Sequence, residues 1–225
     1  MTLGDAPPLV DTGLHAPPVD PTELEGFPSA APPEEVHRLT THTEPWHYAG
    51  YEEAATHEGG RFDLPLPDGT CYAGATLDGC LVEKVLRGGV IVVPEERLEE
   101  LWHAIAPVTG PMDLADMAAR AAGGYGINGE VHTTLDYSQT RPWAEKFFLI
   151  DRNGIRYKAR GDAAQEEVSI AFFGENGDHS APPGVGDAVV TQLNVTVAKY
   201  LLRGRGIRVI PAATKVLTGP VPAKP

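Results

Sequence analysis

The chain of 225 residues has little positive charge, few cysteines and no long apolar stretch. Its 18 lysines and arginines face 31 acidic residues, and the net charge of -13 argues against a broad DNA- or RNA-binding face. No run approaches the roughly 20 apolar residues of a membrane-spanning helix, so we expect no membrane association. The first residues lack a basic stretch followed by an apolar core, so we expect no secretory signal. The two cysteines, Cys71 and Cys80, suit a reducing cytoplasm, where we expect the protein to act.

Positive charge is absent altogether from residues 1–35, which hold eight of the 21 prolines and seven acidic residues. Such a composition buries too little apolar surface to offset the entropy lost on ordering. We therefore predict a disordered acidic tail over residues 1–35, a folded domain over residues 36–211 and a loose tail over residues 212–225. A docking arm that uses Leu9 or Phe27 is the alternative for the N-terminal tail.

Hydrophobic patterns in the rest of the chain interleave strands with helices. Alternating or continuous apolar runs predict strands at 36–41, 70–73, 90–93, 130–134, 155–159, 168–173 and 206–210. Helical spacing predicts helices at 94–106, 112–122, 140–148 and 190–201, and a further one that Thr76 caps and Gly88 ends. Together these segments predict an α+β fold with a mixed β-sheet core and flanking helices.

The stretch of residues 59–87 concentrates side chains that suit a phosphate-bearing ligand. Arg61, Tyr72 and Glu83 follow one another at intervals of eleven residues. Arginine binds phosphate through paired hydrogen bonds, a tyrosine ring covers a flat heterocycle, and a carboxylate stabilises a sugar cation. Together they predict a site for a dinucleotide that is cleaved at its sugar. Taken singly, each has a plain structural alternative: a surface charge, core filling and a solvated helix residue.

The order and spacing of several short motifs resemble the RES domain, a family named for its arginine, glutamate and serine. The motifs are Gly-Gly-Arg61-Phe, Tyr72-Ala, Leu-Val-Glu83, Gly-Ile-Arg156-Tyr157 and Val-Ser169-Ile-Ala-Phe-Phe. The resemblance covers about residues 36–210 and implies a RES-like catalytic domain with a fold similar to ADP-ribosyltransferases. RES proteins are known as bacterial toxins of toxin–antitoxin pairs. Characterised members degrade NAD+ by hydrolysis or phosphorolysis, and some modify a protein with ADP-ribose.

The resemblance implies a role for each motif residue. Glu83 would stabilise the oxocarbenium-like ribose, or hold a ribose hydroxyl or the acceptor. Arg61 would grip the pyrophosphate, because its planar fork suits phosphate better than lysine does. Tyr72 would pack against nicotinamide or ribose, and Ser169 would hydrogen-bond the ligand or orient Glu83. Further candidates for substrate binding are Arg38, Arg156 and Tyr157.

NAD+ is then the substrate, and we expect neither a metal ion nor an added cofactor. Glu130 and His132 alternate along one predicted strand, and His103 is a further donor. Nothing in the sequence supplies another ligand at a spacing typical of metal sites. We therefore interpret these three residues as structural.

The resemblance also implies a protein partner, an antitoxin of the Xre type that binds DNA and blocks the NAD+ pocket. The acidic tail and the added length around residues 93–139 depart from a compact toxin. Homodimerisation through the apolar helices is a further expectation. Two alternative functions stay open: a transferase that places ADP-ribose on a protein, and a non-catalytic module that binds an antitoxin or another protein.

Overall fold

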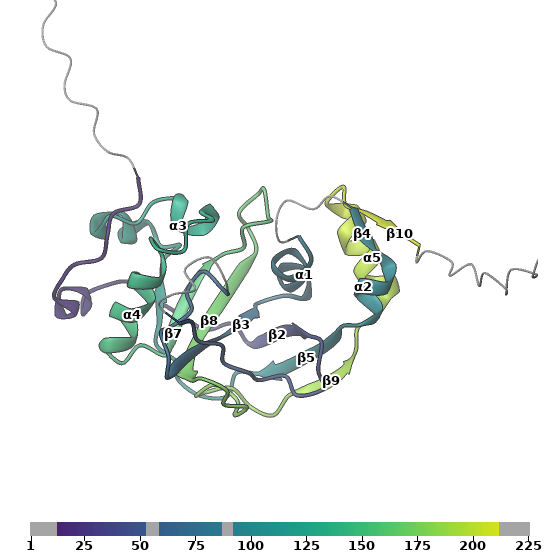
Figure 1. Ribbon diagram of the computed structural model, residues 1–225, viewed down its shortest axis with the longest axis horizontal. Helices are drawn as coiled ribbons and strands as arrows, with labels where there is room; N and C mark the ends of the chain where they lie inside the picture. The colour runs from purple at the N-terminus through teal and green to yellow at the C-terminus, as the bar shows by residue number, and fades with distance from the viewer. Residues whose placement is uncertain (1–12, 53–58, 87–91, 212–225) are drawn as a thin grey trace, which may run out of the picture.

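An eight-stranded sheet is the centre of the computed structural model, which describes residues 13–52, 59–86 and 92–211 (Figure 1). In spatial order its strands are β1 (Ser29–Ala30), β6 (Leu114–Asp116), β7 (Gly154–Lys158), β8 (Val168–Glu175), β3 (Asp68–Gly74), β2 (Glu35–Thr40), β5 (Trp102–Pro107) and β9 (Val189–Gln192). Strands β6 and β7 are parallel, and the other neighbours are antiparallel. The α+β fold with a mixed sheet is as the sequence predicts.

Helices gather at the two ends of the sheet. The helices are η1 (Pro21–Leu24), α1 (Leu77–Val85), α2 (Glu95–Glu99), η2 (Arg120–Tyr125), α3 (Glu130–Thr133), α4 (Arg141–Leu149) and α5 (Val195–Gly204), of which η1 and η2 are 3-10 helices. A parallel two-stranded sheet pairs β4 (Val92–Pro94) with β10 (Arg208–Ile210). In Figure 1, α3 and α4 lie at one end, α2, α5 and the small sheet lie at the other, and α1 lies between them. Among the described residues, no helix is long and apolar enough to span a membrane.

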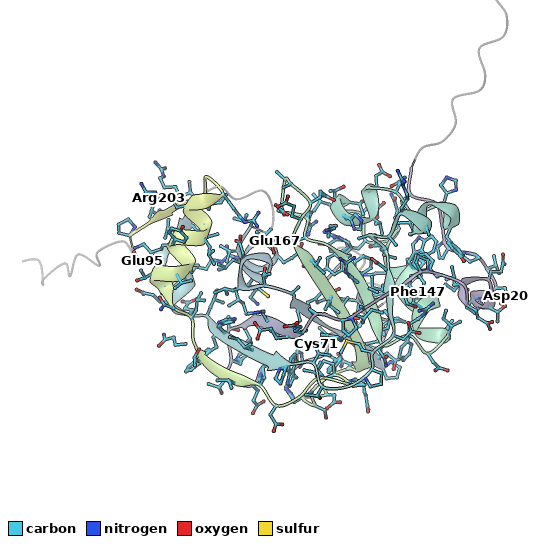
Figure 2. All side chains as sticks on the ribbon, turned by 180° about the vertical axis from the view of Figure 1, so that it is seen from behind. Asp20, Cys71, Glu95, Phe147, Glu167 and Arg203 are labelled. Atoms are coloured by element: carbon cyan, nitrogen blue, oxygen red, sulfur yellow. The ribbon has the colours of Figure 1, made fainter. Side chains whose placement is uncertain are left out.

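Both faces of β8 are buried, which explains its continuous apolar sequence. Ala171 and Phe173 belong to the core cluster that contains α4, whereas Ile170 and Phe172 belong to a second cluster. Cys71 of β3 lies in this second cluster, near the middle of the molecule in Figure 2. The period of two along a strand places successive side chains on opposite faces, so a strand that is covered on both sides needs no polar positions.

Helix α1 begins and packs as its sequence predicts. The Thr76 hydroxyl accepts a hydrogen bond from the Gly79 amide at 2.9 Å, which satisfies one free N–H of the first turn. Leu81 and Val85 are fully buried and cluster with Leu202 of α5. The predicted helix end at Gly88 lies outside the described residues.

Two predicted helices are wrong because strand pairing outweighs helical spacing. The segment 94–106 forms the short helix α2 and then β5, which lies between β2 and β9. Ala104 and Ala106 are buried with less buried residues between them, which is the period of a strand. The segment 112–122 forms β6, which pairs with β7, and only then enters η2. Both strands pair with distant parts of the chain, and local spacing does not reveal such partners.

Two other segments also differ from prediction. Within the segment 130–134, where the sequence predicts a strand, Glu130–Thr133 form the short helix α3, and just before it the Asn128 side chain accepts a hydrogen bond from the Glu130 amide at 2.8 Å. The segment 190–201 begins as strand β9, and α5 starts only after Asn194, which caps it by accepting from the Val197 amide at 3.2 Å. The remaining predicted strands are confirmed in their described parts, and the helix predicted at 140–148 is α4.

The expected N-terminal tail is wrong for residues 13–35, which pack on the domain. Leu24 and Phe27 are buried against α4, and β1 pairs with β6. The Trp143 indole N–H donates to the backbone carbonyl of His15 at 2.9 Å. The few apolar residues of this acidic segment are thus enough to order it, because they pack against an aromatic surface of the domain. Asp20 and Phe147 lie at the same end of the molecule in Figure 2. Residues 1–12 and 212–225 lie outside the described residues.

Candidate active site

A cavity of about 160 Å³ opens where β3, β7 and β8 meet α1. Its lining residues are Arg38, Leu39, Arg61, Tyr72, Ala73, Cys80, Glu83, Lys84, Tyr137, Tyr157, Arg160 and Ser169. Of the predicted site residues, all but Arg156 line it. Among the described lining residues, four carry a positive charge and Glu83 is the acidic one. The protein is acidic overall, but this cavity favours an anionic ligand.

A tight turn at Gly59-Gly60 places Arg61 in the wall of the cavity. The Gly60 amide donates a short hydrogen bond to the Asp63 carboxylate, and the Tyr72 hydroxyl donates to the same carboxylate at 2.7 Å. Gly59 has a φ of +86°, which favours glycine. A Cβ on Gly60 would collide with the Tyr72 hydroxyl. The two glycines are therefore required by the turn itself, apart from any role in binding.

Arg61 is a buried cation whose guanidinium has no hydrogen-bond partner among the residues that the structure describes. Its exposed fraction is 4%, and its three guanidinium nitrogens find no acceptor among the described residues. The guanidinium carbon lies 5.4 Å from the ring centre of Tyr157 and 5.9 Å from that of Phe62. Aromatic faces offset only about 0.5–2 kcal/mol of the desolvation of a cation. The donors of Arg61 are therefore suited to bind an anionic ligand in this cavity.

The field of Arg61 reaches the nearby His132. Burial first, and then the positive charge of Arg61, lower the pKa of His132 to about 4. The His132 Nδ1 accepts a hydrogen bond from the Lys158 amide at 3.3 Å, as expected of a neutral ring. The ring of His132 thus contacts the backbone of β7, and its structural role stays a prediction. Within the described part of the chain, no group of three or more His, Cys, Asp or Glu residues is arranged to hold a metal ion.

Glu83 projects from α1, off the apolar face that packs against α5. Its Oε1 accepts a hydrogen bond from the backbone amide of Arg160 at 2.6 Å. The side chain is partly exposed and lines the cavity with Arg61 and Tyr72. A carboxylate held by a fixed amide and facing a cavity is suited to stabilise positive charge on a ligand.

Tyr72 and Ser169 come from the two strands that form the floor. The Tyr72 hydroxyl accepts from the Phe62 amide at 2.8 Å and donates to Asp63, so its ring rather than its hydroxyl is left for a ligand. Burial, and then the charge of Asp63, raise the pKa of Tyr72 well above its usual value. The Ser169 hydroxyl is buried without a hydrogen-bond partner among the described residues. Ser169 is therefore a second polar group that a ligand could satisfy.

The three remaining substrate-binding candidates have different surroundings. Arg38 lines the cavity, and its guanidinium donates to the backbone carbonyl of Tyr72, while its Nε is buried without a partner among the described residues. Tyr157 is 1% exposed and forms part of the wall. Arg156, its neighbour on β7, is not among the lining residues and forms an ion pair with Asp116 at 2.8 Å. Alternation along the strand separates the two side chains.

Sequence reasoning missed Tyr137, Arg160 and Lys84, which also line the cavity. The Arg160 guanidinium donates to the Tyr137 hydroxyl at 3.2 Å. Tyr137 and Arg160 lie in loops, where no periodic pattern marks a residue. Lys84 follows Glu83 directly on α1, and only its position beside the glutamate could have drawn attention to it.

The cysteine thiols are unsuited to nucleophilic chemistry. Cys80 lines the cavity, but its Sγ donates to the His37 carbonyl at 3.0 Å, and burial raises its pKa to about 12. Burial likewise raises the pKa of Cys71. A thiolate is the reactive form, so both residues are inert at neutral pH.

Comparison with known proteins gives a family and a structural relative. A family model of the RES domain matches residues 16–192. The crystal structure of the M. tuberculosis MbcT-MbcA toxin–antitoxin complex contains a chain with the same fold, at a TM-score of 0.57 and 16% sequence identity. That similarity covers 81% of this chain and 96% of the other. A search of curated proteins gives no match. Because the family model spans most of its length, the chain belongs to the RES domain family.

Proposed function

We propose that this protein is a toxin that cleaves NAD+ at the bond between nicotinamide and ribose. Membership of the RES domain family and the fold shared with a chain of a toxin–antitoxin complex support the class. The cavity supports the substrate, because it combines cations for a pyrophosphate, an aromatic ring and one carboxylate. NAD+ enters as the substrate, and the proposal needs no metal ion and no further cofactor. The cytoplasm is the compartment in which we propose that it acts.

The observation that carries the proposal is the buried guanidinium of Arg61. A cation without a partner in a protein interior is costly, and a bound pyrophosphate would satisfy its donors through paired hydrogen bonds. The buried Nε of Arg38 and the hydroxyl of Ser169, which line the same cavity, likewise have no hydrogen-bond partner among the described residues. The cavity volume of about 160 Å³ is below that of pockets for whole drug-sized ligands, about 300–1,000 Å³. We therefore propose that the cavity holds only part of NAD+. The nicotinamide riboside end would lie inside the cavity, where Glu83 is, and the adenosine end would lie outside it.

In the proposed reaction, the bond between C1″ of ribose and the nicotinamide nitrogen breaks. Its electron pair leaves with nicotinamide, which becomes neutral without a proton. Glu83 stabilises the positive charge that develops on the ribose. An acceptor oxygen then bonds to C1″: water gives ADP-ribose and a proton, and phosphate gives ADP-ribose-1″-phosphate. Tyr72 packs against the ring, and Ser169 holds a polar group of the ligand.

A protein antitoxin is the partner that we propose. The structural relative was solved as a toxin–antitoxin complex, and a partner that covers the cavity would block the substrate. The Xre type of this antitoxin and the homodimer stay predictions.

The test is an assay of NAD+ loss with product identification by chromatography, run with and without phosphate. We expect wild type to release nicotinamide and Glu83→Gln to release almost none. Glu96→Gln, an exposed glutamate on α2, is the matched control and should act like wild type. ADP-ribose as the product indicates hydrolysis. ADP-ribose-1″-phosphate that appears only with phosphate indicates phosphorolysis, and ADP-ribose attached to a protein indicates a transferase. A folded wild type that leaves NAD+ intact in every condition would overturn the proposal.

A further inference from the structure

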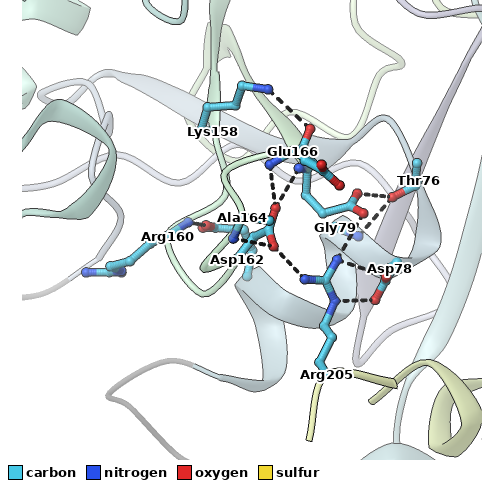
Figure 3. Close-up of polar contacts among 11 residues, drawn as sticks. Thr76, Asp78, Gly79, Lys158, Arg160, Asp162, Ala164, Glu166 and Arg205 are labelled. Atoms are coloured by element: carbon cyan, nitrogen blue, oxygen red, sulfur yellow. Dashed lines mark hydrogen bonds and ion pairs between the residues drawn. The ribbon is translucent and has the colours of Figure 1, made fainter. Parts of the chain in front are cut away.

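One arginine joins three carboxylates from two segments that border the candidate site. Arg205 directly follows α5, and its side chain is 20% exposed. Its Nε and Nη2 each donate to Asp78 at 2.9 Å, its Nη1 donates to Asp162 at 2.7 Å, and its Nη2 also donates to Glu167 at 3.0 Å. Figure 3 shows the guanidinium between Asp78 and Asp162. A planar fork that is used by several acceptors fixes their relative positions better than a single ammonium could.

The first of these contacts holds the helix that carries Glu83. Asp78 lies in the first turn of α1, five residues before Glu83. The cap of the same helix is tied in as well, because the Thr76 hydroxyl donates to Glu167 at 2.5 Å. The start of α1 is therefore fixed to Arg205 directly and through Glu167.

The second contact holds the loop that supplies the hydrogen-bond donor to Glu83. Asp162 lies between β7 and β8, with a side chain that is 3% exposed. Its carboxylate accepts from the amides of Glu166 at 2.6 Å and Glu167 at 2.8 Å, which fixes the conformation of the loop. Arg160, two residues before Asp162, donates its amide to Glu83 at 2.6 Å. Arg205 thus holds both the acceptor helix and the donor loop of this bond.

We propose that Arg205 is a positioning residue that keeps the Glu83 carboxylate in place by joining α1 to the loop of residues 159–167. Arg205 lies beyond the segment 16–192 that matches the RES domain, so a residue outside that segment supports the candidate site without lining the cavity. The placement of Glu83 is independent of the reaction, whereas the kinetic consequence rests on the proposed NAD+ cleavage. Misplacement of a reacting group by about 1 Å is enough to lower a rate by about 100-fold.

The kinetic test compares Arg205→Gln and Arg205→Lys with Arg203→Gln, an exposed arginine on the last turn of the same helix. Each variant is assayed with NAD+ at a temperature where circular dichroism shows it fully folded. We expect Arg205→Gln to lower kcat by about 10-fold or more with KM changed less than about 2-fold, because the Arg61 wall is untouched. Arg205→Lys should lie between it and wild type, and Arg203→Gln should match wild type. A folded Arg205→Gln with wild-type kcat, or with only KM raised, would overturn the proposal.

Hydrogen exchange of the Arg160 amide separates this proposal from the proposed function, because it needs no substrate. We expect the amide to exchange at least about 10-fold faster in Arg205→Gln than in wild type, and at the wild-type rate in Arg203→Gln. If wild type consumes no NAD+ but the exchange difference is found, the proposed function fails and the positioning role stands. Equal exchange in wild type and Arg205→Gln refutes the positioning role whether or not NAD+ is cleaved. If Arg205→Gln fails to fold, Arg205→Lys decides by the same two measurements.

Discussion

At the scale of the residue, we expect the buried charge of Arg61 to lower the stability of the fold and to favour binding of NAD+. Its guanidinium is buried at 4% exposure and finds no hydrogen-bond acceptor among the described residues. Replacing it with an apolar side chain of similar volume removes from the interior a charge that has no acceptor within the described part of the chain. We expect Arg61→Met to raise the free energy of unfolding by about 1–3 kcal/mol and to abolish stabilisation of the protein by NAD+. Urea unfolding with and without NAD+ measures both effects.

Arg156 provides the matched control for this prediction. It lies outside the cavity lining, and its charge is paired with Asp116. Arg156→Met should leave stabilisation by NAD+ intact and should not raise the free energy of unfolding, because it breaks the ion pair with Asp116. If Arg61→Met lowers the free energy of unfolding as much as Arg156→Met does, Arg61 has a structural role rather than a role in ligand binding.

Asp162 gives the fold a defined dependence on pH. Burial alone would raise its pKa, but hydrogen bonds from the amides of Glu167 and Glu166 and from Arg205 outweigh burial and lower the pKa from 3.8 to about 2. A carboxylate with a lowered pKa in the folded state stabilises the protein above the unfolded value, and this contribution is lost as the pH falls through about 2. The shift corresponds to about 2 kcal/mol.

We therefore expect wild type to lose about 2 kcal/mol more stability between about pH 5 and pH 2 than Asp162→Asn does. Urea midpoints at a series of pH values in that window measure the difference. Parallel pH curves for the two proteins would show that the network around Arg205 contributes nothing through Asp162.

At the scale of the element, the Gly59-Gly60 turn holds the wall of the site. A Cβ on Gly60 would meet the Tyr72 hydroxyl and, at 2.6 Å, the Asp63 Oδ1. We expect Gly60→Ala to lower the free energy of unfolding by about 1–3 kcal/mol and to weaken NAD+ binding, because the turn must move. Gly124 in η2 is the control, since a Cβ there would meet nothing within 4 Å. Equal thermal stability of the two alanine variants would contradict this account of the turn.

The N-terminal segment is an element that composition hides. Phe27 is 2% exposed, and its ring centre lies 4.7 Å from that of Phe147 and 5.0 Å from that of Tyr125. We expect Phe27→Ala to lower the free energy of unfolding by about 3–5 kcal/mol, as measured by urea unfolding. Val19→Ala, at a side chain that is 90% exposed, should change it by less than about 0.5 kcal/mol. A small loss for Phe27→Ala would restore the view of this segment as a tail.

These elements also show what the sequence can and cannot reveal about the fold. Strands β3, β7 and β8 and helices α1 and α4 carry clear patterns and form as predicted. The helix at 94–106 is predicted from the helical spacing of Leu98, Leu101 and Ile105. That prediction is wrong because β5 pairs with β2, which lies far away in the chain and leaves no local pattern. The prediction of a tail fails for residues 13–35 because it rests on the average content of proline and charge. The packing of this segment depends on two buried apolar side chains, Leu24 and Phe27.

The candidate site likewise contains residues that the sequence predicted and residues that it did not. Arg61, Tyr72, Glu83 and Ser169 are brought together in one cavity, although their roles stay predictions. These four residues could be predicted because each belongs to a short motif of consecutive residues that also forms its own turn, strand or helix. Arg160 was not predicted, because its contact with Glu83 uses a backbone amide in a loop and leaves no side-chain signal.

At the scale of the whole molecule, the folded unit extends beyond the matched RES segment, which ends at residue 192. Helix α5 contributes Ala198 and Leu202 to the core cluster that includes Leu81 and Val85 of α1. Removal of α5 would expose that apolar face of α1 and would also remove Arg205. The C-terminal part of the chain is therefore expected to be necessary both for folding and for the placement of Glu83.

Two truncated chains test this extent of the folded unit. We expect the chain of residues 1–192 to be insoluble or rapidly cleaved by protease, because burial of the α1 face contributes about 1.5–3 kcal/mol for each large aliphatic side chain. The chain of residues 1–211 should keep the melting temperature and the proteolysis pattern of the full chain, since 212–225 are predicted to be a loose tail. A stable, protease-resistant 1–192 would show that the domain ends where the family match ends. It would also remove the basis for a role of Arg205, because the site would then be complete without it.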